Sequence, residues 1–188
     1  AAADPAAVAR RRERAALWAE LMRAAWALRM AQEARAAAAA LLAPSWAADR
    51  DKELVRDQAE ARFVIGETLV AQMKSDAAKV AAALEKPAAS VGRRLDDEAR
   101  LQTLLPHALR ALDDLDPELS SSFAALLQTS AAVLDDMQLT LQSFTDGESG
   151  DDAPVTTVNI ADAVLAGCRH RLLDSRRGAM DAIRLGFQ

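Results

Sequence analysis

The stretch between Pro5 and Pro44 constrains the fold most, because it contains neither glycine nor proline. Alanine, leucine, methionine, arginine and glutamate dominate it, and these residues have the highest helix propensities. Asp4 supplies an N-cap acceptor ahead of Pro5, whose missing N–H costs nothing at the first position of a helix. We therefore predict one continuous helix over residues 4–43, which Pro44 ends.

A second helical pattern follows Pro44 and reaches residue 85, with Gly66 as its only interruption. That glycine either weakens the helix slightly or lets a neighbouring helix approach closely. A turn over residues 42–46 would fold the two helices into an antiparallel hairpin over residues 4–85. Paired residue numbers would then sum to roughly 90, given the rise per residue of a helix. In this register two apolar stripes face each other, one with Leu17, Leu21, Ala25 and Leu28, the other with Ile65, Leu69 and Met73.

Three further helical patterns cover the hairpin, over residues 88–112, 117–145 and 159–187. Pro106 interrupts the first, and periodicity does not decide whether it kinks one helix or separates two. Asp116 followed by Pro117 is an N-cap and first-position pair that predicts the start of the second. The acidic, glycine-rich residues 146–154 predict a flexible loop before the third.

The composition favours closely packed helices over a sheet. Aromatic residues make up only 4 % of the chain, tyrosine is absent, and alanine supplies much of the 51 % hydrophobic content. A chain of 188 residues is long enough for one domain with a substantial core. We predict a single all-α domain over residues 1–188, an elongated antiparallel bundle of four principal helices with one or two short helices.

Motifs for chemistry are not found in this sequence. Its two histidines and single cysteine lie far apart, and the Glu-x-x-His pattern of di-iron bundles is missing, so we predict no metal, no cofactor and no catalytic residue. The net charge of −5 provides no basic field for nucleic acid. The sequence contains no run of about 20 apolar residues, so we predict no membrane span in this chain. Compartment is left open, because one cysteine is compatible with either redox state.

Polar side chains interrupt the apolar stripes of the predicted hairpin. In the predicted register Gln32 lies opposite Gln58, and Arg35 and Arg62 lie within about two turns of each other. Guanidinium groups fit carboxylate or phosphate oxygens, so these four residues form a candidate site for a small anion. The alternative is that they specify helix register or extend to the surface.

A second apolar stripe runs along the first helix, turned about 100° around the helix axis from the leucine stripe. Its members are Trp18, Met22, Trp26 and Met30. Either the helix packs between two neighbours, as in any four-helix bundle, or part of this stripe is exposed and binds a partner. These four residues are therefore the candidate partner-binding residues.

Together these features predict a non-enzymatic protein-interaction or scaffold module that binds a protein partner or self-associates. Arginine far outnumbers lysine and alanine is abundant, which is typical of a GC-rich bacterial genome. A bacterial secretion or signalling assembly would suit such a module. The alternative is a small-anion-sensing domain of a receptor, with the site between the first two helices and the terminal helices continuing into membrane spans of a longer protein.

Overall fold

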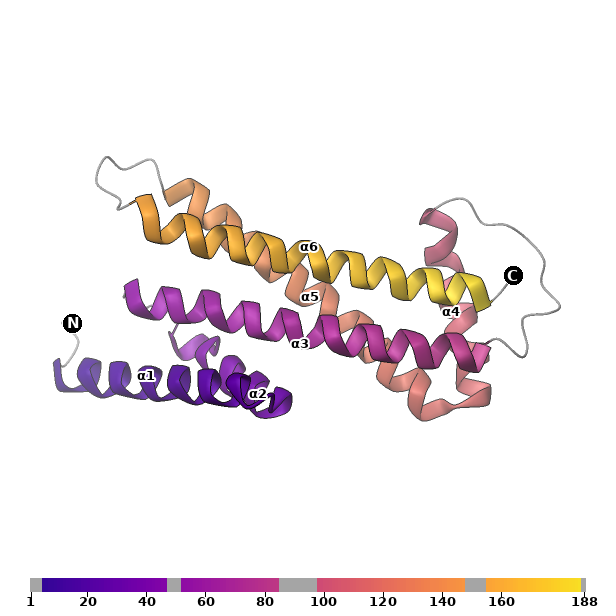
Figure 1. The fold of residues 1–188 in the computed structure, drawn as a ribbon, viewed down its shortest axis with the longest axis horizontal. Coiled ribbons are helices and arrows are strands. Elements are labelled where there is room, and N and C mark those ends of the chain that lie inside the picture. The colour runs from indigo at the N-terminus through magenta and orange to yellow at the C-terminus, as the bar shows by residue number, and fades with distance from the viewer. Residues whose placement is uncertain (1–4, 47–51, 85–97, 148–154, 187–188) are drawn as a thin grey trace. The chain divides into compact units, whose positions relative to one another are not determined.

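The computed structural model describes residues 5–46, 52–84, 98–147 and 155–186 (Figure 1). Those residues form six α-helices and one short 3₁₀ helix, with no strand among them. The predicted all-α class is therefore confirmed, while the antiparallel four-helix arrangement and the single domain stay predictions. The elements are α1 (Pro5–Ala27), α2 (Ala31–Leu41), η1 (Pro44–Trp46), α3 (Lys52–Leu84), α4 (Glu98–Leu115), α5 (Pro117–Gly147) and α6 (Val155–Gly186).

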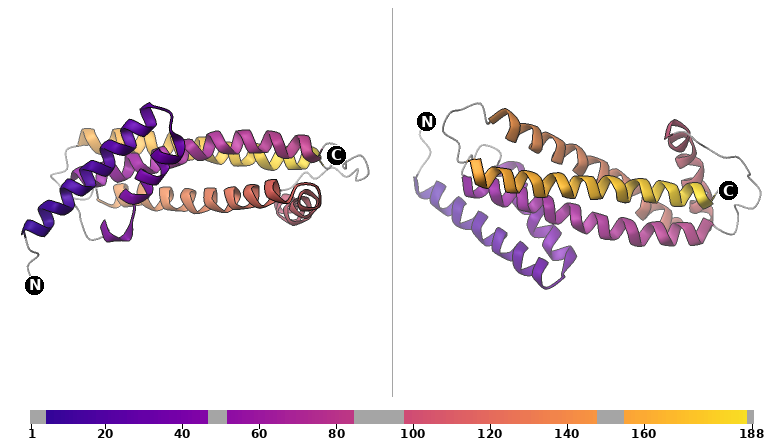
Figure 2. Two further views of the ribbon diagram at one scale, coloured as in Figure 1. Left: turned by 90° about the horizontal axis from the view of Figure 1, so that it is seen from below. Right: turned by 45° about the horizontal axis from the view of Figure 1, so that its top comes forward.

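The single helix predicted over residues 4–43 is wrong, because the chain turns at residues 28–30. Helix α1 ends before this turn, and α2 runs back beside it in every view (Figures 1 and 2). The hairpin at the start of the chain is therefore formed by α1 and α2. The register predicted from a turn at Pro44 is wrong as a consequence.

Hydrogen bonds at the end of α1 explain how the helix stops without glycine or proline. The N–H of Met30 donates to the Ala25 carbonyl at 2.9 Å, and the N–H of Arg29 donates to the Trp26 carbonyl at 3.0 Å. This pair of bonds is the Schellman arrangement, in which the residue after the helix takes a left-handed conformation. Arg29 does so with a φ of 58°, at a position where glycine is the usual residue.

Packing accounts for the turn where helix propensity does not. Propensities of ordinary residues differ by less than about 1 kcal/mol, so they are easily outweighed by tertiary contacts. Folding at residues 28–30 buries the small side chains of α1 and α2 in one core with residues of η1 and α3. The buried members of this core are Ala15, Ala19, Met22, Ala25, Ala34, Ala37, Ala38, Leu41, Trp46, Leu54, Ala61 and Val64.

The described residues group into two compact units. The first draws on residues 1–68 and 136–169, and contains α1, α2, η1 and parts of α3, α5 and α6. The second draws on residues 69–135 and 170–188, and contains α4 with the remaining parts of α3, α5 and α6. Its buried side chains include Leu69, Met73, Val80, Leu84, Leu112, Phe123, Leu126, Leu172 and Ile183.

One sequence signal in the later helices is confirmed, one open question is decided, and one predicted boundary is corrected. The Asp116 carboxylate accepts the Leu119 N–H at 3.0 Å, which is the predicted N-cap of α5. Helix α4 is continuous through Pro106. Helix α6 starts at Val155, ahead of the predicted start at residue 159. The predicted loop over 146–154 and the first part of the helix over 88–112 lie largely outside the described residues.

Gly66 marks a close approach of three helices, which confirms one of its two interpretations. A Cβ atom at this position would lie 2.5 Å from the Cys168 Sγ of α6 and 2.5 Å from the Met137 Cε of α5. Both neighbours are fully buried. The Cys168 thiol also faces the Phe63 carbonyl, with Sγ and oxygen 3.7 Å apart. Glycine is therefore the residue that lets α3, α5 and α6 meet here.

We expect Arg29→Gly to raise the free energy of unfolding by about 1 kcal/mol. A left-handed conformation costs a non-glycine residue about 1–2 kcal/mol, and the greater freedom of glycine in the unfolded chain offsets part of this. Urea denaturation followed by circular dichroism measures the change. The control Ala36→Gly, at an exposed position within α2, should lower the free energy by about 1 kcal/mol. A loss of stability in Arg29→Gly would contradict the left-handed turn.

We expect Gly66→Ala to lower the free energy of unfolding by up to about 2 kcal/mol. Overpacking a core costs about 1–3 kcal/mol, and the gain in helix propensity returns only about 1 kcal/mol. Gly178 of α6 is the matched control, because a Cβ there meets no atom within 4 Å. Gly178→Ala should therefore stabilise the protein in the same denaturation experiment. If both alanine variants are stabilised, the three helices do not approach as closely as described.

Candidate functional site

The side of α1 that packs into the core consists mainly of alanine. Ala15, Ala19, Met22 and Ala25 are each exposed by 5 % or less, and their spacing of three or four residues places them on one side of the helix. Small side chains let helix backbones come close together. This alanine side determines how α1 is rotated, and hence which of its residues face outward.

The prediction that the leucine stripe of α1 faces the core is wrong. The side chains of Leu17, Leu21 and Leu28 are exposed by 66 %, 49 % and 71 %. They lie on a different side of the helix from the alanine side. The prediction failed because its register placed the turn at Pro44. We call these three residues the leucine face. Scattered single exposed leucines are ordinary, whereas three aligned ones place apolar side chains along one side of the helix and its end.

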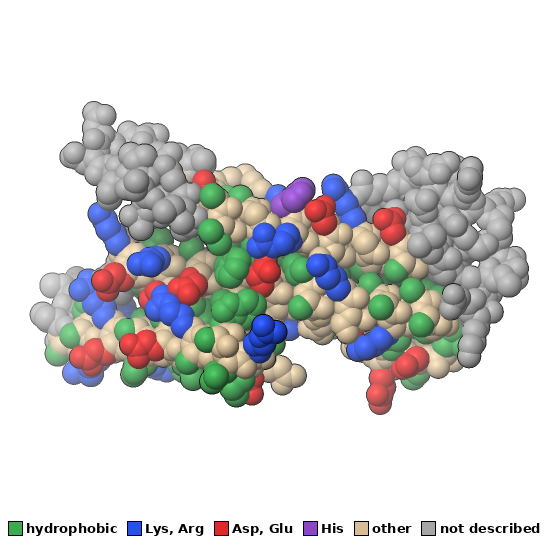
Figure 3. Space-filling model, viewed as in Figure 1, with side chains coloured by type: hydrophobic (Ala, Val, Ile, Leu, Met, Phe, Trp, Pro, Cys, Tyr) green, Lys and Arg blue, Asp and Glu red, His purple; other side chains and the backbone are tan. Residues whose placement is uncertain are grey.

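The candidate partner-binding residues fall partly into the core. Met22 is fully buried, so it cannot touch a partner while α1 stays packed. Trp18 is half-buried and packs against the core of the first unit. Trp26 and Met30 are exposed by 37 % and 43 %. Figure 3 shows apolar side chains at the surface around the turn between α1 and α2. Partner binding through these four residues stays a prediction.

Two contacts hold α1 against α3 in this rotation. The Arg23 guanidinium pairs with Asp57, and its Nε donates to Glu60 Oε2 at 2.9 Å. The hydrogen bond to Glu60 is the main cause that raises the pKa of Arg23 above its ordinary value, so its charge persists. One turn along α1, the Trp26 ring meets the Phe63 ring edge to face, with centroids 6.4 Å apart. Each contact fixes the leucine face on the outer side.

The structure brings together two of the four candidate anion-binding residues. Arg62 Nε donates to Asp136 Oδ2 at 2.8 Å and Nη2 donates to Asp136 Oδ1 at 3.3 Å, which is a two-bond pair between α3 and α5. Its Nη1 donates to the Gln58 carbonyl at 3.3 Å, and the Gln58 side-chain amide donates to the Leu41 carbonyl at 3.1 Å. The charge of Arg62 is thus compensated within the chain.

The other two candidates lie elsewhere on α2. Gln32 is exposed and Arg35 is half-buried. Gln58 bonds to Leu41, the last residue of α2. Gln32 lies nine positions earlier in α2, about 13 Å away along the helix axis. The predicted pairing of Gln32 with Gln58 is therefore wrong, and ligand binding by the four residues stays a prediction.

Sequence reasoning missed the partners of Arg23 and Arg62. Asp57 and Glu60 share one side of α3 because they are three residues apart, and that spacing is a visible signal for a cation between them. Asp136 gives no such signal, since its partner lies on a different helix far along the chain. Only the packing of α5 beside α3 brings the two groups together.

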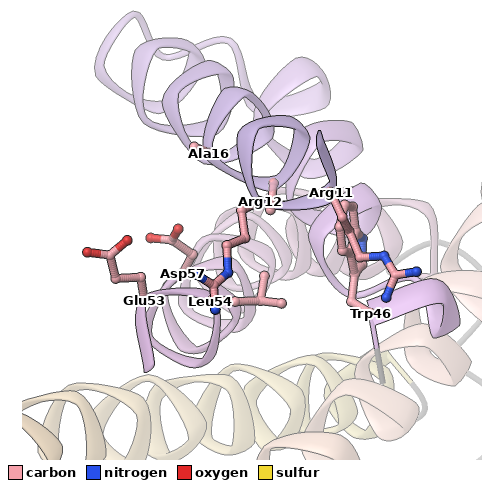
Figure 4. A pocket seen from close by; sticks show the side chains of 8 residues that line it. Arg11, Arg12, Ala16, Trp46, Glu53, Leu54 and Asp57 are labelled. Atoms are coloured by element: carbon pink, nitrogen blue, oxygen red, sulfur yellow. The ribbon is translucent and has the colours of Figure 1, made fainter. Parts of the chain in front are cut away.

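A small cavity of about 90 Å³ lies between the start of α1 and the start of α3 (Figure 4). Arg12 extends from α1 toward Leu54 and Asp57, and Arg11 lies beside Trp46. The lining therefore mixes both charges. Its residues are Arg11, Arg12, Ala15, Ala16, Trp46, Glu53, Leu54 and Asp57.

No group of three or more His, Cys, Asp or Glu side chains in the described ranges is placed to hold a metal ion. None of the helices that the structure describes is both long and apolar enough to cross a membrane.

Comparison of the chain with protein-family models, curated proteins and solved structures gave no match. Any function must therefore be argued from the geometry of the chain itself.

The rotation of α1 predicts very different losses of stability for two apolar residues of this helix. Met22→Ala should lower the free energy of unfolding by about 2–5 kcal/mol, since it leaves a cavity in the core. Leu17→Ala should change it by less than about 0.5 kcal/mol, because the side chain is mostly exposed. Thermal and urea unfolding of both variants measure the difference. A larger loss in Leu17→Ala would mean that the leucine face is the buried side.

Proposed function

We propose that this chain is a non-enzymatic protein-interaction module that binds an amphipathic helix of another protein through the leucine face. The observation that supports this proposal is the exposure of Leu17 and Leu21 on α1 and of Leu28 in the turn after it, which their spacing of four and seven residues places on one line. Apolar surface of this kind is removed from water when a partner helix covers it, which is a principal driving force of association. The rigid attachment of α1 through Arg23 keeps the surface formed before the partner arrives.

The charges beside the leucine face specify the partner. Glu13 lies one turn before Leu17, and Glu20 lies about one turn after it. Both carboxylates are exposed, so they form an acidic border along one edge of the face. A complementary helix carries an apolar stripe bordered by lysine or arginine on the edge that meets Glu13 and Glu20.

A second copy of α1 fits this face less well than a basic-bordered helix. In an antiparallel pair of identical helices, equivalent edges meet, so the Glu13 and Glu20 border of one copy would face that of the other. In a parallel pair, Arg14 would face Arg14 of the second copy at the end of the stripe. Like charges oppose association in either orientation. The proposal therefore commits to a different protein as the partner.

Two further elements of this proposal rest on sequence alone. The arginine bias and alanine content are typical of a GC-rich bacterial genome, and a scaffold role in a bacterial secretion or signalling assembly is proposed on that basis and on the helical fold. The alternative of an anion-sensing receptor domain with Gln32, Arg35, Gln58 and Arg62 as its site is not favoured by any contact, since Arg62 pairs with Asp136.

A pair of designed peptides tests the proposed partner chemistry. Both are amphipathic helices of three heptads with leucine at the a and d positions, one bordered by lysine and the other by glutamate. Fluorescence anisotropy of each labelled peptide with the full chain gives its Kd. We expect the lysine-bordered peptide to bind about tenfold more tightly, because each exposed ion pair adds about 0.2–1 kcal/mol.

Matched variants separate the leucine face from general attraction to an acidic protein. Leu17→Ser with Leu21→Ser should weaken the lysine-bordered peptide at least about tenfold, whereas Leu139→Ser at an exposed position of α5 should not. Glu13→Gln with Glu20→Gln should reduce the preference for lysine, and Asp113→Asn with Asp114→Asn should leave it intact. Equal binding of both peptides, or unchanged binding after loss of the two leucines, would disprove the proposal.

A further inference from the structure

A second hollow, of about 250 Å³, opens beside the first turns of α1. It shares Arg11 and Trp46 with the smaller cavity of Figure 4, but none of the described residues in its lining is acidic. Six residues of α1 and η1 line it, and half of them are arginines. They are Ala7, Arg10, Arg11, Arg14, Ser45 and Trp46.

The electrostatic balance of the two hollows differs. In the smaller cavity, Glu53 and Asp57 of α3 face the arginines. In the larger hollow, Arg11 and Arg14 make no hydrogen bond or ion pair with any residue that the structure describes. The guanidinium groups of Arg11 and Arg14, three residues apart on one helix, repel each other, and an anion between them removes that repulsion.

The floor of the hollow is fixed by hydrogen bonds. Trp46 is only 5 % exposed, and its indole Nε1 donates to the Ala40 carbonyl at 2.7 Å. Its backbone N–H donates to the Ala43 carbonyl at 3.1 Å. The adjacent Ser45 is exposed, so its hydroxyl group is available as a neutral donor. The site is therefore formed in advance, and the arginines are the part that adjusts to a ligand.

We propose that this hollow binds a small, multiply charged oxyanion carrying phosphate or carboxylate groups. Guanidinium groups bind both kinds of oxygen with paired hydrogen bonds, and Arg11 and Arg14 together exceed the need of a single charge. The volume lies below the usual range of about 300–1,000 Å³ for pockets that hold larger ligands. The ligand therefore has the size of pyrophosphate or a tricarboxylate. The lining of the hollow includes neither the three leucines of the leucine face nor Arg62.

Isothermal titration of the full chain with pyrophosphate, with citrate and with orthophosphate tests the proposal at constant ionic strength. Pyrophosphate and citrate report on phosphate and carboxylate chemistry separately, and orthophosphate reports on the effect of fewer charges. We expect at least one of the two larger anions to bind at one site, with about tenfold higher affinity than orthophosphate. Absence of heat with both larger anions at millimolar concentration would overturn the proposal.

Three charge-removing variants locate the anion. Arg11→Gln and Arg14→Gln should each weaken binding about tenfold, and circular dichroism checks that both fold, as their exposed positions imply. Arg56→Gln is the matched control, since this arginine is exposed on α3 in the same unit and lies outside the hollow. An equal loss in the control would mean general attraction to positive charge, and would overturn the site.

A fourth variant separates this site from the anion site predicted from the sequence. Arg62→Gln should leave the affinity for the anion unchanged, because Arg62 is paired with Asp136 and does not line the hollow. Loss of binding in Arg62→Gln, with normal binding in Arg11→Gln and Arg14→Gln, would place the anion between α2 and α3 and disprove the proposal. Neither result depends on the leucine face.

Discussion

Close packing of alanine side chains around Met22 is the constraint on which the first unit depends. Alanine buries little apolar area, so each contact adds little hydrophobic free energy. Its small size, however, lets helix backbones approach, and many weak dispersion contacts then add up. Ala15, Ala19 and Ala25 of α1 share this core with residues of α2 and α3. The same packing turns the larger leucines of α1 outward, and so produces the surface that we propose for a partner.

Polar contacts complete what the alanine core begins. The core alone would tolerate a small rotation of α1, because alanine side chains are small and interdigitate little with their neighbours. Arg23 removes this freedom by reaching two carboxylates of α3, and Trp46 closes the end of the core with a hydrogen bond to the chain that precedes it. Arg62 and Asp136 connect α3 with α5 in the same way. The arginines therefore divide into those that fix helices and those, Arg11 and Arg14, that face a hollow without an acidic partner among the described residues.

Local signals in the sequence predicted the features that depend on neighbouring residues. The cap at Asp116, the helical class and the close approach at Gly66 follow from residue types and spacings, and the structure confirms them. The turn at residues 28–30 could not be predicted in this way, because Arg29 occupies a position where glycine is the usual signal. Missing that turn displaced the register, reversed the two sides of α1, and separated Gln32 from Gln58. The left-handed conformation of Arg29 therefore determined which predicted site residues could lie close together.

The contact at Gly66 also gives the chain a reporter of its own motion. Cys168 is the only cysteine, it is fully buried, and it fills the space that Gly66 leaves open. A thiol reagent therefore has one target, and reaches it only when α3 separates locally from α6. When opening and closing are fast relative to the reaction, the labelling rate measures the free energy of that local opening rather than of complete unfolding. Partner or anion binding to the first unit could then be followed through this single sulfur atom, without any introduced label.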